Sequence, residues 1–226
     1  YIRYTHFGEG AYDETELWIR ARLTETGIDL QQPAGRTVQQ RGYDPAVYNR
    51  DAVTSLTREL YAGTDRNYAA MRFRDDPPYV RNLEFYDQPN IAIDYVDAGG
   101  HENHFIYLQG LWRNAEESLV HARTTEDNRD YIAIKFHATS VNVVMDSPDR
   151  NPASVVVTIN NRSLKSSEAG IDIQWTDDGD SYVLVDSPRM YNIIEIAFFD
   201  GYELKLSPNE EGLQLFAFTF GGFKNE

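Results

Sequence analysis

The sequence contains no cysteine in its 226 residues. This absence excludes disulfide bonds, thiolate nucleophiles, zinc sites with sulfur ligands and any redox motif of the C-x-x-C type from this chain. Long apolar runs are also lacking, and none approaches the ~20 residues that a membrane-spanning helix requires. We therefore expect a soluble segment that does not insert into a membrane and does not itself exchange electrons with a substrate.

Positive charge is scarce as well. The 36 acidic residues outnumber the 21 basic residues, so the formal net charge is −15. A protein that binds nucleic acid needs a positive surface, and a surplus of carboxylates of this size repels a polyanion. The composition therefore excludes nucleic acid as an expected partner.

Aromatic residues are abundant, with 15 Tyr, 11 Phe and 3 Trp. Their large flat side chains suit the pleated surface of a sheet. From about residue 57 onward, apolar and polar residues alternate in short segments separated by turn-forming residues. The alternating apolar positions are Ile132, Ile134 and Phe136; Val141, Val143 and Met145; Val155, Val157 and Ile159; Ile194, Ile196 and Phe198; and those between Leu213 and Phe220. This period of two predicts a mainly β fold, an antiparallel β-sandwich of the jelly-roll type, over residues 57–226.

Two segments precede the predicted sandwich. The pattern in residues 1–27 indicates a short strand, Tyr1–Phe7, and a helix that has Asp13 as its N-cap and Gly27 after its end. A strand and one helix cannot bury each other well enough to be stable alone. We therefore expect them to be the end of a longer domain and to pack on the sandwich or on a neighbouring chain. Residues 28–56 are polar, and we interpret them as a linker.

Two parts of the chain resemble a known family. Residues 2–10 (IRYTHFGEG), followed by residues 12–16 (YDETE), resemble the last strand and the start of the last helix in bacterial thioredoxin-like proteins of the DipZ type. A second set of motifs resembles the domain that follows the thioredoxin fold in that family. These motifs are T-x-E-x-Y-x-G at residues 57–63, LQGLW at 108–112, FHA at 136–138, PRMY at 188–191 and LQLFAFTFG at 213–221. The chain departs from the family pattern over residues 65–87.

The resemblance implies a fold, a location and a role. Residues 1–27 would be the C-terminal strand and helix of a thioredoxin-like domain, and residues 57–226 a jelly-roll domain resembling carbohydrate-binding modules. The family lies outside the cytoplasm, in the periplasm or at the cell surface, and its members can be tethered to a membrane. Its catalytic cysteine pair lies upstream of the last strand and has no counterpart here. We therefore expect no enzymatic activity and no cofactor in this chain, whereas the whole protein would be a thioredoxin-like oxidoreductase.

A sugar-binding site needs aromatic rings exposed flat against the apolar face of a pyranose, beside planar hydrogen-bonding groups. Side chains near predicted strand ends supply both, and the candidate ligand-binding residues are Tyr107, Trp112, Arg113, Arg189 and Tyr191. Further candidates are Tyr182, Asn160 and Asn161. Trp175 shares the parity of Ile171 and Ile173, so we expect it in the core.

Two clusters resemble metal sites, but we predict no metal at either. His101–His104 (HENH) contains two histidines without a third ligand, and a solvated turn is the expected structure. Asp177–Asp180 (DDGD) has carboxylates that suit calcium but lacks the spacing and final glutamate of an EF-hand, so a structural calcium stays an alternative to an acidic hairpin turn. His6, His121 and His137 have no adjacent nucleophile or carboxylate in the sequence, so we expect them at the surface.

Three functions are compatible with these observations. In the first, the chain is an accessory domain that binds carbohydrate or another envelope component near its own thioredoxin domain. In the second, it is a structural domain that packs on the thioredoxin domain or on a partner subunit and binds no small ligand. The third, a glycan hydrolase, is disfavoured because no acid–base pair stands out among the 36 acidic residues.

Overall fold

The computed structural model describes residues 12–25, 56–73, 77–147 and 152–222. The chain separates into two compact units, residues 1–47 and residues 48–226. In the first unit, helix α1 spans Tyr12–Glu25, as expected from the sequence. The expected strand Tyr1–Phe7 and nearly all of the expected linker lie outside the described residues. Within the described ranges, no helix is long and apolar enough to cross a membrane.

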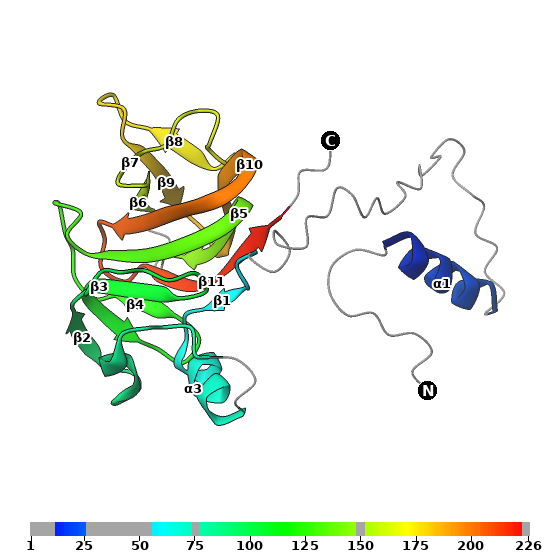
Figure 1. Ribbon diagram of the computed structural model, residues 1–226, viewed down its shortest axis with the longest axis horizontal. Coiled ribbons are helices and arrows are strands. Elements are labelled where there is room, and N and C mark those ends of the chain that lie inside the picture. Colours follow the sequence, from blue (N-terminus) through cyan, green and yellow to red (C-terminus); the bar gives the residue numbers. More distant parts are fainter. Residues whose placement is uncertain (1–11, 26–55, 74–76, 148–151, 223–226) are drawn as a thin grey trace. The chain divides into compact units, whose positions relative to one another are not determined.

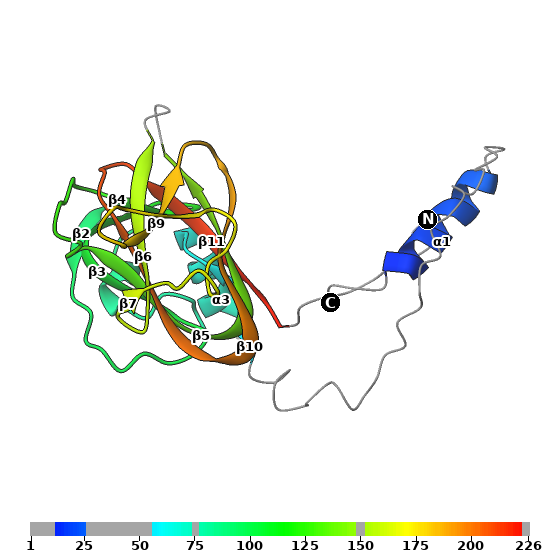
Figure 2. The same cartoon turned by 90° about the horizontal axis from the view of Figure 1, so that it is seen from above.

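The second unit is a β-sandwich of antiparallel strands, which Figure 1 and Figure 2 show from two sides. Its strands are β1 (Leu60–Tyr61), β2 (Ala92–Tyr95), β3 (Ile106–Asn114), β4 (Leu119–His121), β5 (Tyr131–Asp146), β6 (Ala153–Ile159), β7 (Arg162–Ser163), β8 (Ile173–Trp175), β9 (Ser181–Val185), β10 (Arg189–Pro208) and β11 (Gln214–Gly221). Neighbours follow the order β1-β11-β4-β3-β5-β10-β6-β9-β8, with β2 beside β3 and β7 beside β6. The mainly β, antiparallel sandwich predicted from the alternating pattern is therefore confirmed.

The longest strands, β5 and β10, pair with each other over most of their length (Figure 1). Their register runs from Leu206 opposite Ile132 to Arg189 opposite Met145. The first part of β5 also pairs with β3, and its last part pairs with β11. Strand β5 therefore connects the pairing of β3 at one end with the pairing of β11 at the other.

The buried faces of the central strands follow the predicted alternation. The side chains that fill the core from β5 and β6 are at most 1% exposed, namely Ile132, Ile134, Phe136, Val141, Val143, Met145, Val155, Val157 and Ile159. Full burial of one such side chain contributes about 1.5–3 kcal/mol. The aliphatic stripe is therefore the main source of stability in this unit.

Shifts in strand register overturn the prediction at two places. Phe198 was expected to share a buried face with Ile194 and Ile196, but its side chain is 79% exposed. The register of β10 against β5 is interrupted between Glu195 and Asp200, so buried and exposed side chains no longer alternate there. A second shift, between Leu215 and Ala217 in β11, buries Leu215 and Phe218, which lie three residues apart.

Helix α3 (Thr64–Phe73) is an element that the sequence pattern does not predict. It is attached through Asn67, which is fully buried. The amide of Asn67 donates to the carbonyls of Tyr61 and Gly63 at 3.0 and 2.9 Å. Its Oδ1 accepts from the backbone N–H groups of Tyr79 and Val80 at 2.8 and 2.9 Å. One buried amide therefore joins β1, α3 and the segment that follows the helix.

A second buried polar group, the carboxylate of Asp130, fixes the segment before β5. Its side chain is 0% exposed and pairs with the guanidinium of Arg123. It also accepts hydrogen bonds from the backbone N–H of Leu111 and from Nε2 of His121, both at 3.1 Å. Burial alone would raise the pKa of Asp130, but these hydrogen bonds outweigh it and hold the pKa below its usual value.

The position of His121 corrects the expectation that this residue lies at the surface. Its side chain is 0% exposed, and its Nδ1 lies 2.9 Å from the carbonyl oxygen of Glu210. The partner carboxylate, Asp130, is nine positions away along the chain, so no adjacent acid marks the pair in the sequence. His137 is half-buried, and His6 lies outside the described residues.

We predict that Asp130→Ala lowers the free energy of unfolding by about 3 kcal/mol, because it leaves Arg123, His121 and the Leu111 N–H without their buried acceptor. Urea denaturation followed by tryptophan fluorescence measures this change. The matched control is Asp127→Ala, because the side chain of Asp127 is 61% exposed and pairs with an exposed arginine. The control should change stability by less than about 0.5 kcal/mol, and an equal loss in both variants would contradict the role assigned to Asp130.

Candidate functional site

A polar surface lies on the side of the sheet that faces away from the core, across strands β3, β5, β10, β6, β9 and β8. Successive side chains of a strand point to opposite faces, so each register shows which residues share this surface. The surface, called the polar face below, contains Tyr107, Gln109, Tyr131, Ala133, Lys135, Thr158, Gln174, Tyr182, Glu203 and Lys205. These residues belong to six strands, which lie between residues 106 and 208.

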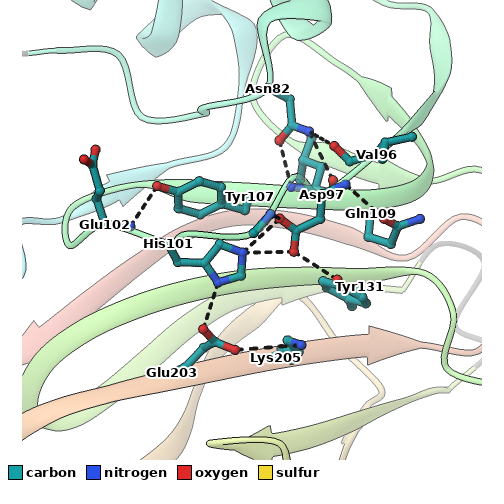
Figure 3. A network of polar contacts seen from close by, with 12 residues as sticks. Asn82, Val96, Asp97, His101, Glu102, Tyr107, Gln109, Tyr131, Glu203 and Lys205 are labelled. Carbon is teal, nitrogen blue, oxygen red and sulfur yellow. Dashed lines mark hydrogen bonds and ion pairs between the residues drawn. The ribbon is translucent and has the colours of Figure 1, made fainter.

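A loop over residues 96–105 covers the β3 and β5 end of the polar face and is attached to it by His101 (Figure 3). Nε2 of His101 lies 2.9 Å from both carboxylate oxygens of Asp97. Nδ1 lies 2.9 Å from Oε2 of Glu203 in β10. The side chains of His101 and Asp97 are only 5% and 4% exposed. The expectation that residues 101–104 form a solvated turn is therefore wrong for His101.

His101 contacts the loop and β10 through its two ring nitrogens. Nε2 faces the carboxylate of Asp97 in the loop, and Nδ1 faces the carboxylate of Glu203 in β10. Buried carboxylates need such polar partners because an isolated charge in the interior is costly. The Asp97–His101–Glu203 cluster therefore joins the loop to the sheet.

Two glycines allow the loop to turn tightly enough for this contact. Gly99 and Gly100 have φ angles of +73° and +72°, which lie in the left-handed region that glycine adopts without strain. The N–H of Gly99 donates to Oδ1 of Asp97 at 2.8 Å. The turn brings His101 back to Asp97, where its ring also packs on Tyr107 with the ring centroids 4.3 Å apart.

Asp97 is the centre of the hydrogen bonds at this end of the polar face. Its Oδ2 accepts from the phenol of Tyr131 at 2.9 Å, and its backbone N–H donates to Gln109 at 2.9 Å. Burial acts to raise the pKa of Asp97, but hydrogen bonds from His101, Gly99 and Tyr131 lower it below its usual value. Burial, followed by the hydrogen bond to Asp97, raises the pKa of Tyr131 to about 12. Tyr131 is therefore a hydrogen-bond donor at neutral pH.

The rest of the polar face is open and offers both hydrogen-bonding groups and ring faces. Nζ of Lys205 donates to Oδ1 of Asn161 at 2.8 Å and lies 4.7 Å from the ring centroid of Tyr131. The phenol of Tyr182 donates to Oε1 of Gln174 at 3.0 Å. Lys135 is exposed beside Glu203. This set can recognise a polar ligand through donors, acceptors and aromatic contacts.

Three of the five sequence-predicted ligand residues have buried rings. Tyr107, Trp112 and Tyr191 are 7%, 1% and 0% exposed. Their polar atoms bond within the protein: Nε1 of Trp112 donates to the carbonyl of Gln109, and the phenol of Tyr191 donates to the carbonyl of Ser187. These rings pack in the interior because they sit on strand positions that face the core or the covering loop. They leave no flat face for a sugar in this structure.

The two predicted arginines lie at separate places. Arg113 donates to Asn90 at 2.9 Å, near the β2 edge of the sheet. Arg189 forms an ion pair with Asp172 at 2.8 Å, and its guanidinium lies 3.7 Å from the ring centroid of Tyr191. Of the five predicted ligand residues, the structure therefore brings Arg189 and Tyr191 together without forming a joint site with Arg113.

The additional candidate residues lie in different parts of the sandwich. Tyr182 lies on the polar face, and Asn161 contacts it through Lys205. Asn160 and Asn161 have φ angles of +49° and +59° and form the tight turn from β6 to β7. Trp175, expected in the core, is instead 40% exposed because it ends the edge strand β8, and Ile171 is 92% exposed. The alternation expected from Ile171 to Trp175 does not hold, because β8 is only three residues long and does not include Ile171.

The acidic segment Asp177–Asp180 forms the turn between β8 and β9, with Gly179 at a φ angle of +89°. The backbone N–H of Asp180 donates to Oγ1 of Thr176 at 3.1 Å. Among the described residues, no group of three or more His, Asp or Glu side chains is arranged to hold a metal ion.

The Asp97–His101–Glu203 cluster was not among the residues predicted from the sequence. One signal was present, because Gly99-Gly100 before a histidine indicates a tight turn that can return the ring to a preceding acid. Glu203 lies 102 residues from His101, and nothing in a single sequence marks that pair.

Comparisons with known proteins give a family and a distant structural likeness. The model of a family described as "Thioredoxin like C-terminal domain" matches residues 57–221. A solved family two carbohydrate esterase from Cellvibrio japonicus is 14% identical with a TM-score of 0.40, and the match covers 59% of this chain and 33% of the esterase. A likeness at this level carries no functional argument. The comparison with curated proteins finds no match.

We predict that Asp97→Asn lowers the free energy of unfolding at neutral pH by about 2 kcal/mol, because the neutral amide replaces a carboxylate that accepts charge-assisted hydrogen bonds. The pKa of Asp97 is lowered in the folded state, so its contribution is complete above the ordinary pKa of 3.8. It is lost as the pH falls below that value through the folded-state pKa. Denaturation of both proteins at several pH values measures the difference.

The matched control for this prediction is Asp94→Asn, because the side chain of Asp94 is 65% exposed. Its difference from the parent protein should be less than about 0.5 kcal/mol at every pH. A difference for Asp97→Asn that grows as the pH falls would contradict the assignment.

Proposed function

The chain belongs to the family of thioredoxin-like C-terminal domains, and from this premise we propose that it is the accessory domain of a thioredoxin-family protein of the DipZ type. The family match over residues 57–221 supports the accessory assignment. The resemblance of residues 2–16 to the end of a thioredoxin fold supports the identity of the preceding domain. We further propose a location outside the cytoplasm, in the periplasm or at the cell surface, which rests on the same resemblance.

The role we propose for this accessory domain is to bind carbohydrate through the polar face. The observation that carries this proposal is that the open part of the face offers two hydrogen-bonded pairs, Lys205 with Asn161 and Tyr182 with Gln174. The ring of Tyr131 lies beside the ammonium group of Lys205. Saccharides present hydroxyl groups at the ring edge and C–H groups on the ring face, so they suit such a mixture. The covering loop, attached through His101, gives one end of the site a fixed boundary.

We propose a binding role without catalysis. In support, the carboxylates of Asp97 and Glu203 are both engaged with His101, at 2.9 Å each. A glycosidase needs one carboxyl group free to protonate the leaving group and another free to act as base or nucleophile. Carboxylates whose oxygens lie against the ring nitrogens of His101 are poorly suited to those tasks. The absence of cysteine leaves any disulfide chemistry to the thioredoxin domain.

A structural role is the second candidate, and one observation favours it. Phe198 is 79% exposed at the interruption in β10, and Met190 on the same strand is 55% exposed. Exposed apolar side chains of this size are common contacts with partner proteins. In this alternative, β10 packs on the thioredoxin domain or on a partner subunit, and the polar face binds no small ligand.

The test is a screen of the full chain against bacterial cell-wall saccharides, followed by titration of any ligand by calorimetry. We predict that Tyr182→Ala weakens binding about tenfold by removing one ring contact. Phe198→Ala is the control, because it removes an exposed ring outside the polar face, and it should change the affinity less than about twofold.

The other outcomes decide between carbohydrate binding and the structural role. If no saccharide binds, or if both variants weaken binding equally, carbohydrate recognition by the polar face is wrong. If, in addition, Phe198→Ala weakens association with the thioredoxin domain in analytical ultracentrifugation, the structural role is supported instead.

A further inference from the structure

A groove of about 280 Å³ opens between the start of α3 and the loop that joins β3 to β4. Its lining comes from β1, α3, that loop, β5 and β11, through Tyr61, Asp65, Arg66, Glu116, Glu117, Val144, Phe216 and Ala217. None of these residues belongs to the polar face. The groove is therefore a surface separate from the polar face, and it is independent of the carbohydrate proposal.

The floor of the groove is apolar and partly aromatic. Val144 of β5 lies opposite Ala217 of β11, and the register shift in β11 falls at Phe216. A β-bulge redirects the extra side chain, and here it leaves the Phe216 ring half-buried at the groove. Beside the floor, the guanidinium of Arg66 lies 4.9 Å from the ring centroid of Tyr61. An aliphatic chain placed here would contact the Phe216 ring and a valine.

The two walls are held together by backbone contacts. The N–H groups of Thr64 and Asp65 donate to the carbonyls of Ala115 and Glu116, both at 3.0 Å. Gly63 permits this approach, because a Cβ atom there would lie 2.4 Å from Cα of Glu117. The groove is therefore formed before a ligand arrives, which lowers the entropy cost of binding.

The charge of the walls selects the ligand. Asp65, Glu116 and Glu117 are exposed around the apolar floor, and none forms an ion pair with another residue in the described part of the chain. The single basic residue, Arg66, stacks on Tyr61. We infer that the groove binds a lysine or arginine side chain of a partner polypeptide. Its aliphatic stem packs on Val144 and Phe216, and its cation lies among the three carboxylates.

The net charge of −15 supports this choice of partner, because it attracts a basic polypeptide and increases its rate of encounter. Lysine and arginine side chains combine an apolar stem with a charged end. That combination matches a groove with an apolar floor and an acidic rim.

The test uses the full chain labelled with ¹⁵N and an acetylated, amidated peptide with two lysines separated by glycine. Titration followed by NMR should shift the backbone amides of Asp65, Arg66, Glu116, Glu117 and Ala217. The same peptide with norleucine in place of lysine keeps the stem and removes the cation, so it should bind at least fivefold more weakly. Raising the salt concentration should also weaken binding of the lysine peptide.

Two double variants with equal changes in charge separate local contact from general attraction. Glu116→Gln with Glu117→Gln should weaken binding of the lysine peptide about fivefold, since two exposed ion pairs are lost. Asp177→Asn with Asp178→Asn makes the same change in the turn between β8 and β9 and should alter the affinity less than twofold. Phe216→Ser, with its fold checked by the NMR spectrum, should weaken binding of both peptides by removing the floor.

Several results would overturn the inference. These are no binding of the lysine peptide, equal weakening by both double variants, or shifts spread over the whole surface. Tighter binding of a glucosamine oligomer than of the lysine peptide would also overturn it, because the cation would then come from an amino sugar. The saccharide screen on the polar face is independent of all four results, so failure of one proposal leaves the other standing.

Discussion

The pairing of β5 with its neighbours is the constraint on which both candidate binding surfaces depend. Its first part supplies Tyr131 and Lys135 to the polar face, and its last part supplies Val144 to the groove. The intervening side chains, such as Ile134 and Val143, fill the core. A register shift of one residue would turn the apolar set outward and the polar set inward. Burial of the aliphatic stripe therefore fixes the position of every functional side chain on this strand.

The acidic surplus is divided between two environments with different consequences. Asp130 and Asp97 are buried, and each accepts several hydrogen bonds, since a buried carboxylate without donors is strongly destabilising. Asp65, Glu116 and Glu117 stay exposed around an apolar floor, where their charge is available to a ligand. The buried acids hold loops and strands in place, whereas the exposed acids are suited to recognition. A net charge cannot separate these two groups, because it does not depend on burial.

The sequence predicts the fold better than it predicts the site, and particular residues show why. Ile132, Ile134 and Phe136 alternate in an uninterrupted strand, so parity assigns their buried face correctly. Phe198 and Phe216 lie at register shifts, where parity no longer applies. The side-chain contacts around the site could not be predicted for a different reason. The burial of Trp112 and the contact of His101 with Glu203 depend on strands that meet only in the folded chain. Tyr182, one of the further candidates from the sequence, lies on the polar face, in a strand that keeps strict alternation.

Native-state hydrogen exchange of the full chain tests the central role of β5 most directly. We expect the amides of Ile132, Ile134 and Val143 to be among the slowest to exchange and to open only with global unfolding. The short edge strands β2 and β8 should exchange faster, because each is paired on one side. Fast exchange along β5, with protection concentrated in β2 or β8, would contradict the claim that both surfaces depend on the stable pairing of β5.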